Sequence, residues 1–329
     1  MLAGRLVKAG TTSLEAYEFY LKGRALFCRR GLDIRRAVIC FERAVALDPQ
    51  YALAWSGLAD ARNMLGLYGI EPPQATTPQA KEAAARAVAL DPFLAEAHCS
   101  LACSYQVYDW KWAEAEREFL RALELNPRYL QNLDWYAWFC LVCSQGRFDE
   151  GIAFARKAVE YDPLSAYAHA VVAFTCGYAG RTTEAVEAAK SATELEESFI
   201  AYWALQGALR WDRQFEKAAV AGDMALALSG RGVFALSGQA AIFADWGKIG
   251  EAKSIYAELV ARASREYILP IHFAIAALAA GELDKAVALV REAYEMRDPW
   301  LVVARRWPDF ATLQKDPRFK EILFRMGVK

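Results

Sequence analysis

One short phrase recurs along the chain and constrains its fold more than any other feature. Residues 43–55 read RAVALDPQYALAW and residues 86–98 read RAVALDPFLAEAH, so the first seven letters are identical. Looser copies follow at 121–133 (RALELNPRYLQNL) and 157–169 (KAVEYDPLSAYAH). Tandem repetition at this period predicts a stack of similar units, each of which packs against its neighbours.

The prolines of the repeated phrase give its period, and the small residues before them indicate its secondary structure. Pro49, Pro92, Pro127 and Pro163 are separated by 43, 35 and 36 residues. Counting back from each proline gives the same spacing of small or aromatic residues: Ala37, Phe41, Ala44; Ala80, Ala84, Ala87; Ala115, Phe119, Ala122; Gly151, Ala155, Ala158. Residues at this spacing share one face of an α-helix, where small side chains let a second helix approach closely. Proline ends that helix, because it has no N–H to donate.

The first helix of each predicted hairpin carries a large residue followed four positions later by a small one. The pairs are Trp55 and Ala59, His98 and Ala102, and Trp203 and Gly207. Glycines mark the turns within the hairpins: Gly146, Gly180, Gly247 and Gly281. The small-residue pattern continues after the prolines are lost. The sequence therefore predicts about eight hairpins between residues 14 and 298.

These spacings resemble those of the tetratricopeptide repeat (TPR) family, whose period is about 34 residues. The resemblance covers nearly the whole chain and implies an all-α fold, a right-handed α-solenoid of about eight TPR-like helical hairpins. A finer resemblance lies in EAYEFYLKGRALFCRR (15–30) and DIRRAVICFERAVALDPQYALAWSGLAD (33–60). These segments are similar to the TPR region of bacterial multidomain signalling proteins, where such repeats accompany an adenylate cyclase, a kinase or a TolB-like segment.

Three segments depart from the repeat and set the expected domain limits. Residues 1–13 resemble the end of a linker, and 14–298 form the predicted solenoid. Within it, residues 66–79 contain three prolines, which predict an extended surface loop. From 299 to 329 the alanine pattern stops. Because the last hairpin leaves an apolar face uncovered, this tail is expected to form C-terminal capping helices.

Charge and cysteine content narrow the classes of partner. The chain has 39 Lys and Arg against 40 Asp and Glu, so neither a nucleic acid nor an anionic membrane is a predicted partner. The seven cysteines lie in apolar helical stretches, which favours reduced thiols and a cytoplasmic location. The most apolar segment, 268–281, is shorter than the roughly 20 residues that span a bilayer, so no membrane insertion is expected.

No catalytic, metal or cofactor site is predicted. His98 and His169 stand where sister repeats have Trp55 and Trp203, so packing explains them better than a catalytic or ligand role. Cys140 and Cys143 form a C-x-x-C pair with no second pair to complete a zinc site. The glycines of 229–238 lack the Gly-Lys-Ser/Thr of a phosphate-binding loop.

Binding is expected on the concave side of the solenoid, which the first helices line. The candidate groove residues are those expected to face away from the second helix: Tyr17, Tyr20, Arg24, Phe27, Asp60, Asn63, Gln106, Asp134, Trp138, Phe174, Tyr178 and Trp211. Aromatic side chains contribute large buried areas, so this surface suits a peptide with apolar anchors. The alternative for each ring is that it packs between neighbouring hairpins.

Three functions remain open from the sequence. The leading hypothesis is a non-catalytic scaffold that binds a protein or peptide partner, as the regulatory part of a signalling system with a fused or separate effector domain. The second is a sensor that binds a small ligand and controls such a domain. The third is an all-helical enzyme, which would need several titratable residues to converge in one pocket.

Overall fold

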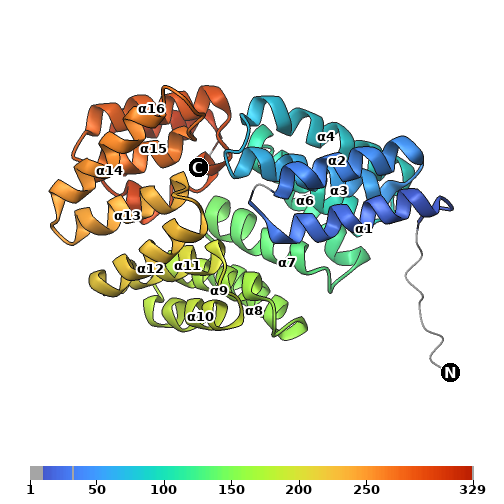
Figure 1. The fold of residues 1–329 in the computed structure, drawn as a ribbon, viewed down its shortest axis with the longest axis horizontal. Helices are drawn as coiled ribbons and strands as arrows, with labels where there is room; N and C mark the ends of the chain where they lie inside the picture. The colour runs from blue at the N-terminus through green and yellow to red at the C-terminus, as the bar shows by residue number, and fades with distance from the viewer. Residues whose placement is uncertain (1–9, 32, 328–329) are drawn as a thin grey trace. The chain divides into compact units, whose positions relative to one another are not determined.

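The structure is a computed structural model that describes residues 10–31 and 33–327 (Figure 1). These residues form α-helices with short 3₁₀- and π-helical segments, and none of them lies in a strand. The predicted all-α fold is confirmed. Most of the predicted linker, residues 1–9, lies outside the described residues. The chain folds into two compact units, residues 1–129 (unit 1) and 130–329 (unit 2).

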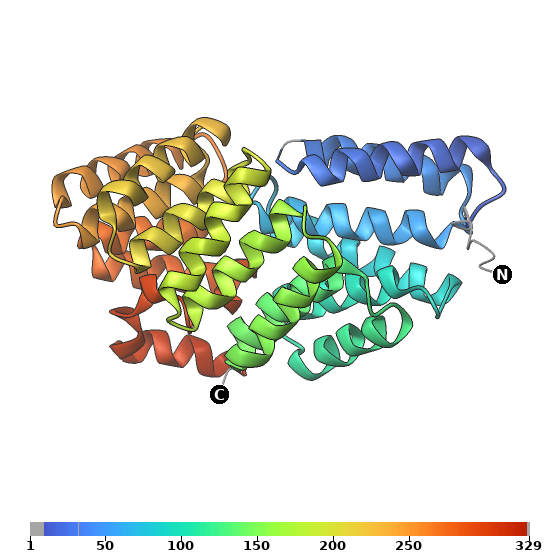
Figure 2. The ribbon, with the colours of Figure 1, turned by 90° about the horizontal axis from the view of Figure 1, so that it is seen from below.

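The described part of unit 1 consists of three helical hairpins in succession (Figure 2). They are α1 (Leu14–Arg29) with α2 (Asp33–Leu47), α3 (Ala52–Leu67) with α4 (Pro73–Leu90), and α5 (Ala95–Ser104), continued by the π-helix η1 (Tyr105–Asp109), with α6 (Trp112–Leu125). Each second helix contacts its own first helix, and α2 and α4 also contact the first helix that follows. The first helices α1, α3 and α5 contact one another in order, so they line one side of the unit.

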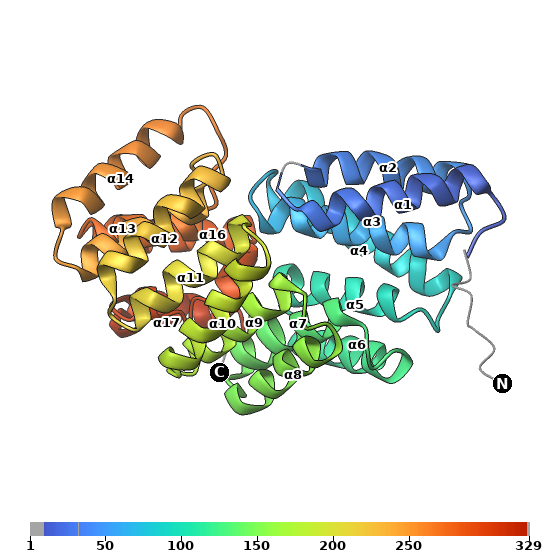
Figure 3. The same cartoon turned by 60° about the horizontal axis from the view of Figure 1, so that its bottom comes forward.

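The described residues of unit 2, 130–327, form five more hairpins and a C-terminal segment (Figure 3). The hairpins are α7 (Leu130–Trp135), continued by the π-helix η2 (Tyr136–Gln145), with α8 (Phe148–Tyr161); α9 (Ala166–Tyr178) with α10 (Thr182–Leu195); α11 (Phe199–Trp211) with α12 (Phe215–Leu228); α13 (Val233–Asp245) with α14 (Ile249–Arg262); and α15 (Pro270–Ala279) with α16 (Leu283–Met296). The 3₁₀ turns η3 (Pro299–Val302), η4 (Pro308–Phe310) and η5 (Leu313–Lys315) precede α17 (Pro317–Arg325).

The small residues of the repeat lie where the helices meet. Ala44 in α2, Ala122 in α6 and Ala158 in α8 are all 0% exposed. The intervening Phe41 and Phe119 are equally buried and fill the space between the small residues. The predicted register of the second helices is therefore confirmed, and it rests on close helix contact at alanine.

The residue before each boundary proline shapes the turn between hairpins. The side chains of Asp48, Asp91, Asn126 and Asp162 accept a hydrogen bond from the backbone N–H two residues later, at 2.9, 2.9, 3.1 and 3.2 Å. Such Asx turns let a short polar side chain replace a backbone partner. The Asp or Asn before each boundary proline therefore stabilises the turn between hairpins, a role that was not predicted from the sequence.

A ring nitrogen in the next first helix completes this turn. Trp55 Nε1 donates to the carbonyl oxygen of Pro49 at 3.0 Å, and the Nε2 atoms of His98 and His169 lie 3.0 Å from the corresponding oxygens of Pro92 and Pro163. The structural role predicted for both histidines is confirmed. Because a carbonyl only accepts, each histidine donates from Nε2.

The prediction of an extended surface loop at residues 66–79 is wrong. Helix α3 continues to Leu67, and α4 begins at Pro73 and includes Pro78. Proline fits the first helical position, whose N–H needs no partner in the helix, and Pro78 forgoes one hydrogen bond. The extra residues lengthen α4, whose first residue packs closely against the end of α3. A Cβ added to Gly66 of α3 would lie 3.2 Å from Pro73 Cα.

None of the seven cysteines, all of which lie in the described residues, forms a disulfide, and Cys28 is exposed. Within residues 10–31 and 33–327, no helix combines the length and apolar character needed to cross a membrane.

We expect Ala122→Leu to destabilise unit 1 by about 1–3 kcal/mol, because the larger side chain overpacks a closed helix contact. Ala113→Leu is the matched control, since Ala113 lies on the exposed side of the same helix. Chemical denaturation measures both variants. Equal free energies of unfolding for the two would contradict the register.

We expect Glu118→Gln to lower the pKa of His98. His98 Nδ1 lies 2.6 Å from Glu118 Oε2, and this hydrogen bond raises the pKa of His98 above its ordinary value. With acceptors at both ring nitrogens, the imidazolium form is favoured. An NMR titration of the histidine ring measures the change, with Glu114→Gln on the same helix as control. An unchanged His98 pKa in Glu118→Gln would show that the pair does not form.

Candidate functional site

Within residues 130–327, five successive first helices each contribute one ring to the side of unit 2 that they line. The rings are Trp138 (η2), Phe174 (α9), Trp203 (α11), Phe234 (α13) and His272 (α15). Neighbouring ring centroids lie 4.4, 4.7, 5.6 and 3.9 Å apart along this series. We call these five residues the aromatic row, and the side of a unit formed by its first helices the inner face.

His272 belongs to this row as a neutral ring. Its Nδ1 lies 2.9 Å from Ser237 Oγ, which donates to the carbonyl oxygen of Phe234 at 3.0 Å. Because the serine proton is used there, His272 donates from Nδ1. Complete burial lowers the pKa of His272 to about 3, so it carries no charge near neutral pH.

The chain's own C-terminal segment lies on the aromatic row. The Trp300 ring centroid is 5.3–5.7 Å from the rings of Trp138, Trp203, Phe234 and His272, and Trp300 is 1% exposed. We call residues Pro299–Phe310, which contain η3 and η4, the strap. Its Leu301, Val303 and Ala304 are also fully buried. The strap therefore covers the inner face of unit 2.

The second anchor of the strap is Arg306 at the end of η2. Its Nη1 donates to the carbonyl oxygens of Cys143 at 2.8 Å and Ser144 at 2.6 Å. The last carbonyls of a helix lack partners within the helix and favour a cation. Gly146 leaves room for the guanidinium, because a Cβ added there would lie 2.7 Å from Arg306 Nε.

The third anchor is an ion pair between Asp309 of the strap and Arg210 of α11. Their side chains are 6% and 11% exposed, and Arg210 Nε also donates to Asp245 Oδ2 at 2.7 Å. Removing one partner of a buried pair leaves an uncompensated charge, so such pairs fix geometry strongly.

Asp298 holds the start of the strap. The chain reverses after α16 through Arg297, whose φ of 55° is in the left-handed region. The Asp298 carboxylate then accepts the backbone N–H groups of Ile271 and Trp300, both at 2.9 Å. Burial raises the pKa of Asp298 to about 7, more than these two hydrogen bonds lower it.

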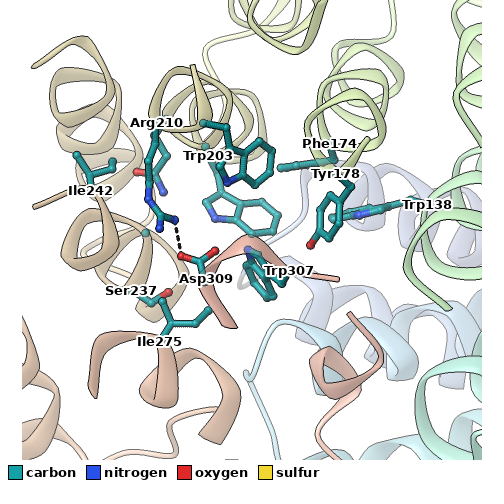
Figure 4. A pocket seen from close by; sticks show the side chains of 14 residues that line it. Trp138, Phe174, Tyr178, Trp203, Arg210, Ser237, Ile242, Ile275, Trp307 and Asp309 are labelled. Atoms are coloured by element: carbon teal, nitrogen blue, oxygen red, sulfur yellow. Dashed lines mark hydrogen bonds and ion pairs between the residues drawn. The ribbon is translucent and has the colours of Figure 1, made fainter. Parts of the chain in front are cut away.

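A cavity of about 30 Å³ lies between the strap and the inner helices (Figure 4). Six aromatic residues line it: Trp138, Phe174, Tyr178, Trp203, Trp211 and Trp307. Its polar wall includes the Arg210–Asp309 pair, which Figure 4 shows beside Ser237. Burial raises the pKa of Tyr178 well above its usual range, so this side chain is a neutral phenol. The wall of the cavity is mainly apolar and presents no separate acid and base.

The structure brings four predicted groove residues together at this cavity: Trp138, Phe174, Tyr178 and Trp211. Asp134 is buried and lies outside the cavity lining. Phe234 and His272 were not among the predicted groove residues, and Trp203 was predicted to be the equivalent of Trp55 and His98. That register was wrong by one residue: Tyr202 stands four residues after the N-cap Ser198, as His169 does after Ser165.

In unit 1 the predicted groove residues divide into two groups. Tyr17, Tyr20 and Arg24 share one stripe of α1 and are partly exposed. Phe27, Asp60, Asn63 and Gln106 are buried, so the expectation that they line an open groove is wrong. Polar contacts between first helices explain two of them. Asp60 accepts from Ser100 Oγ at 2.6 Å, and Asn63 Nδ2 donates to the Ser100 carbonyl oxygen at 3.3 Å.

We expect Asp298→Asn to flatten the pH dependence of unfolding between about pH 4 and 7. A carboxyl whose pKa is raised on folding contributes stability that is fully present below its unfolded pKa of about 3.9 and is lost as the pH rises through 7. The slope should change by up to about 1.4 kcal/mol per pH unit. Denaturant titrations at several pH values measure it.

Asp316→Asn is the matched control, because Asp316 also caps a helix before a proline. Hydrogen bonding to Arg318 lowers the pKa of Asp316, so its contribution is lost only as the pH falls below about 4. If Asp298→Asn kept the parental slope from pH 4 to 7, Asp298 would not be the titrating group.

No family model and no curated protein matches this chain in sequence. Solved structures are similar in fold. Yeast Tom70 is 16% identical with a TM-score of 0.52 over 95% of this chain and 68% of its own. The human IFIT1 dimer with m7Gppp-AAAA is 17% identical with a TM-score of 0.53 over 85% and 72%.

A tetratricopeptide repeat protein from Parabacteroides merdae is 14% identical with a TM-score of 0.52, covering 77% of this chain and 93% of that one. At these identities the likeness concerns the fold. Together with the helical hairpins and their alanine contacts, it shows that the chain has an α-solenoid fold of the tetratricopeptide-repeat type.

Proposed function

We propose that this chain is a non-catalytic scaffold that binds a protein segment on an inner face. One observation carries the proposal: the inner face of unit 2 already holds a polypeptide segment that is not part of the repeat. Trp300 supplies a buried anchor, Arg306 pairs with backbone carbonyls, and Asp309 pairs with Arg210. Buried aromatic anchors and arginine are the groups that dominate protein recognition.

In unit 1 the candidate surface is the stripe of Tyr17, Tyr20 and Arg24 on α1. These side chains are partly exposed. Arg24 Nη1 lies 3.8 Å from Asp60 Oδ2, which orients the guanidinium without burying it fully. Two tyrosine rings and one cation suit a segment with an apolar anchor and an acidic group.

The chemistry of the cavity supports a binding role over catalysis. Acid–base catalysis needs titratable groups with separate roles in one pocket. In the cavity, Arg210 and Asp309 pair with each other and Tyr178 is held neutral. Among the residues that the structure describes, no group of three His, Cys, Asp or Glu is placed to hold a metal ion.

The cavity also favours a second candidate, a sensor for a small apolar or aromatic ligand. Six rings surround it, and Trp307 and Asp309 of the strap form part of its wall. A ligand there would contact inner helices and strap together.

The resemblance of residues 15–30 and 33–60 to repeats of bacterial multidomain signalling proteins supports a regulatory role. The partner would then be an effector domain, fused to this chain or separate from it.

Selection of peptides from a random display library on the full chain tests the scaffold proposal. We expect selected peptides to lose at least tenfold in affinity with Tyr17→Ala or Tyr20→Ala, measured by fluorescence anisotropy. Removing an anchoring ring costs more than 1 kcal/mol. Ile39→Ala on the exposed side of α2 is the control and should bind as the parent does.

A library that yields no peptide above background would overturn the proposal. So would peptides that bind the parent, Tyr17→Ala, Tyr20→Ala and Ile39→Ala equally.

A further inference from the structure

We propose that the inner face of unit 2 takes a partner segment with the chemistry of the strap, and that the strap is its built-in competitor. The segment carries a tryptophan, an arginine six residues later and an aspartate three residues after that, as Trp300, Arg306 and Asp309 do. This inference rests on the proposed scaffold function. It adds the partner's chemistry and the way access is controlled.

The strap is built as a separable element. Its backbone hydrogen bonds are internal turns, such as Val303 N to the Trp300 oxygen at 3.1 Å and Phe310 N to the Trp307 oxygen at 3.0 Å. The hairpins beneath it pack through their own helix pairs, α13 with α14 and α15 with α16.

Release without replacement is unfavourable, which argues for exchange. Trp138, Trp203, Phe234 and His272 all contact Trp300, and they would form one aromatic surface in water. Contiguous exposed apolar patches of this kind mark binding sites. A competing segment must therefore bring a large ring of its own.

The polar anchor points restrict the partner further. The carbonyls of Cys143 and Ser144 are backbone atoms that accept from Arg306. A segment without a cationic donor at this position would leave these two carbonyl oxygens without a hydrogen-bond donor, which would weaken its binding. Asp309 reaches Arg210 only because the strap continues past Trp307. A partner segment must therefore match the strap in length and must carry an acidic group at this position.

Covalent attachment gives the strap its advantage over a partner. An intramolecular segment competes at an effective concentration in the millimolar range. A partner with the same contacts is therefore excluded until the strap is weakened. Substituting an anchor of the strap should increase the affinity for an external segment, whereas substitution of an ordinary binding residue decreases it.

The test uses the full chain and a fluorescein-labelled synthetic peptide of residues 298–312, DPWLVVARRWPDFAT. We expect Arg306→Gln to bind this peptide at least tenfold more tightly than the parent, measured by anisotropy. Arg305→Gln is the matched control and should bind as the parent does, because the Arg305 side chain makes no hydrogen bond or ion pair with a described residue. The same peptide with Trp300→Ala should not bind Arg306→Gln.

Native-state hydrogen exchange on the unaltered chain covers the case in which Arg306→Gln fails to fold. We expect the amides of Leu301 to Phe310 to exchange together, faster than those of α13 and α15. Exchange of the strap only by global unfolding would overturn the inference.

Equal peptide binding by Arg306→Gln, Arg305→Gln and the parent would also overturn it. The scaffold proposal would then still stand on library peptides that depend on Tyr17 or Tyr20, so the two failures are distinguishable.

Discussion

The packing of Trp300 against the aromatic row organises unit 2. Stacked hairpins leave the inner face of their first helices uncovered, and here that face carries large rings from η2 to α15. Trp300 covers them because Arg297 and Asp298 reverse the chain after α16. The contacts of Arg306 and Asp309 depend on that reversal, and the cavity exists because Trp307 and Asp309 close one of its sides.

The fold was predictable where local pattern and packing agree. Ala44 and Ala122 identify the second helices in the sequence, because close contact between helices excludes larger side chains at these positions. The prolines at 72, 73 and 78 misled for a local reason: the same residue that breaks a helix interior also starts one. Trp203 was misplaced because no proline precedes its hairpin, and without that marker the register of α11 was uncertain by one residue.

The site was predictable only in part, for a different reason. Trp138, Phe174, Tyr178 and Trp211 follow from the periodicity of first helices, and the structure gathers them at one cavity. The strap lies outside any periodic pattern. Its arginine meets carbonyls 162 and 163 residues earlier in the chain, and such tertiary contacts have no local signal. The sequence WLVVARRWPDF at 300–310 can be recognised as an aromatic and basic segment. The surface that it packs against cannot be recognised from the sequence.

The contact between Arg306 and the end of η2 changes the folding behaviour expected of unit 2. Stacked repeats usually couple only to their neighbours, so they gain structure progressively and fray from either end. Here the last part of the chain touches the first hairpin of the unit, which joins the two ends of a linear array. Contacts between residues so far apart in the sequence slow folding, because the chain loses conformational entropy in closing the loop before the contacts stabilise it. During synthesis the aromatic row stays uncovered until the strap has left the ribosome, and in that interval a chaperone or a binding partner has first access.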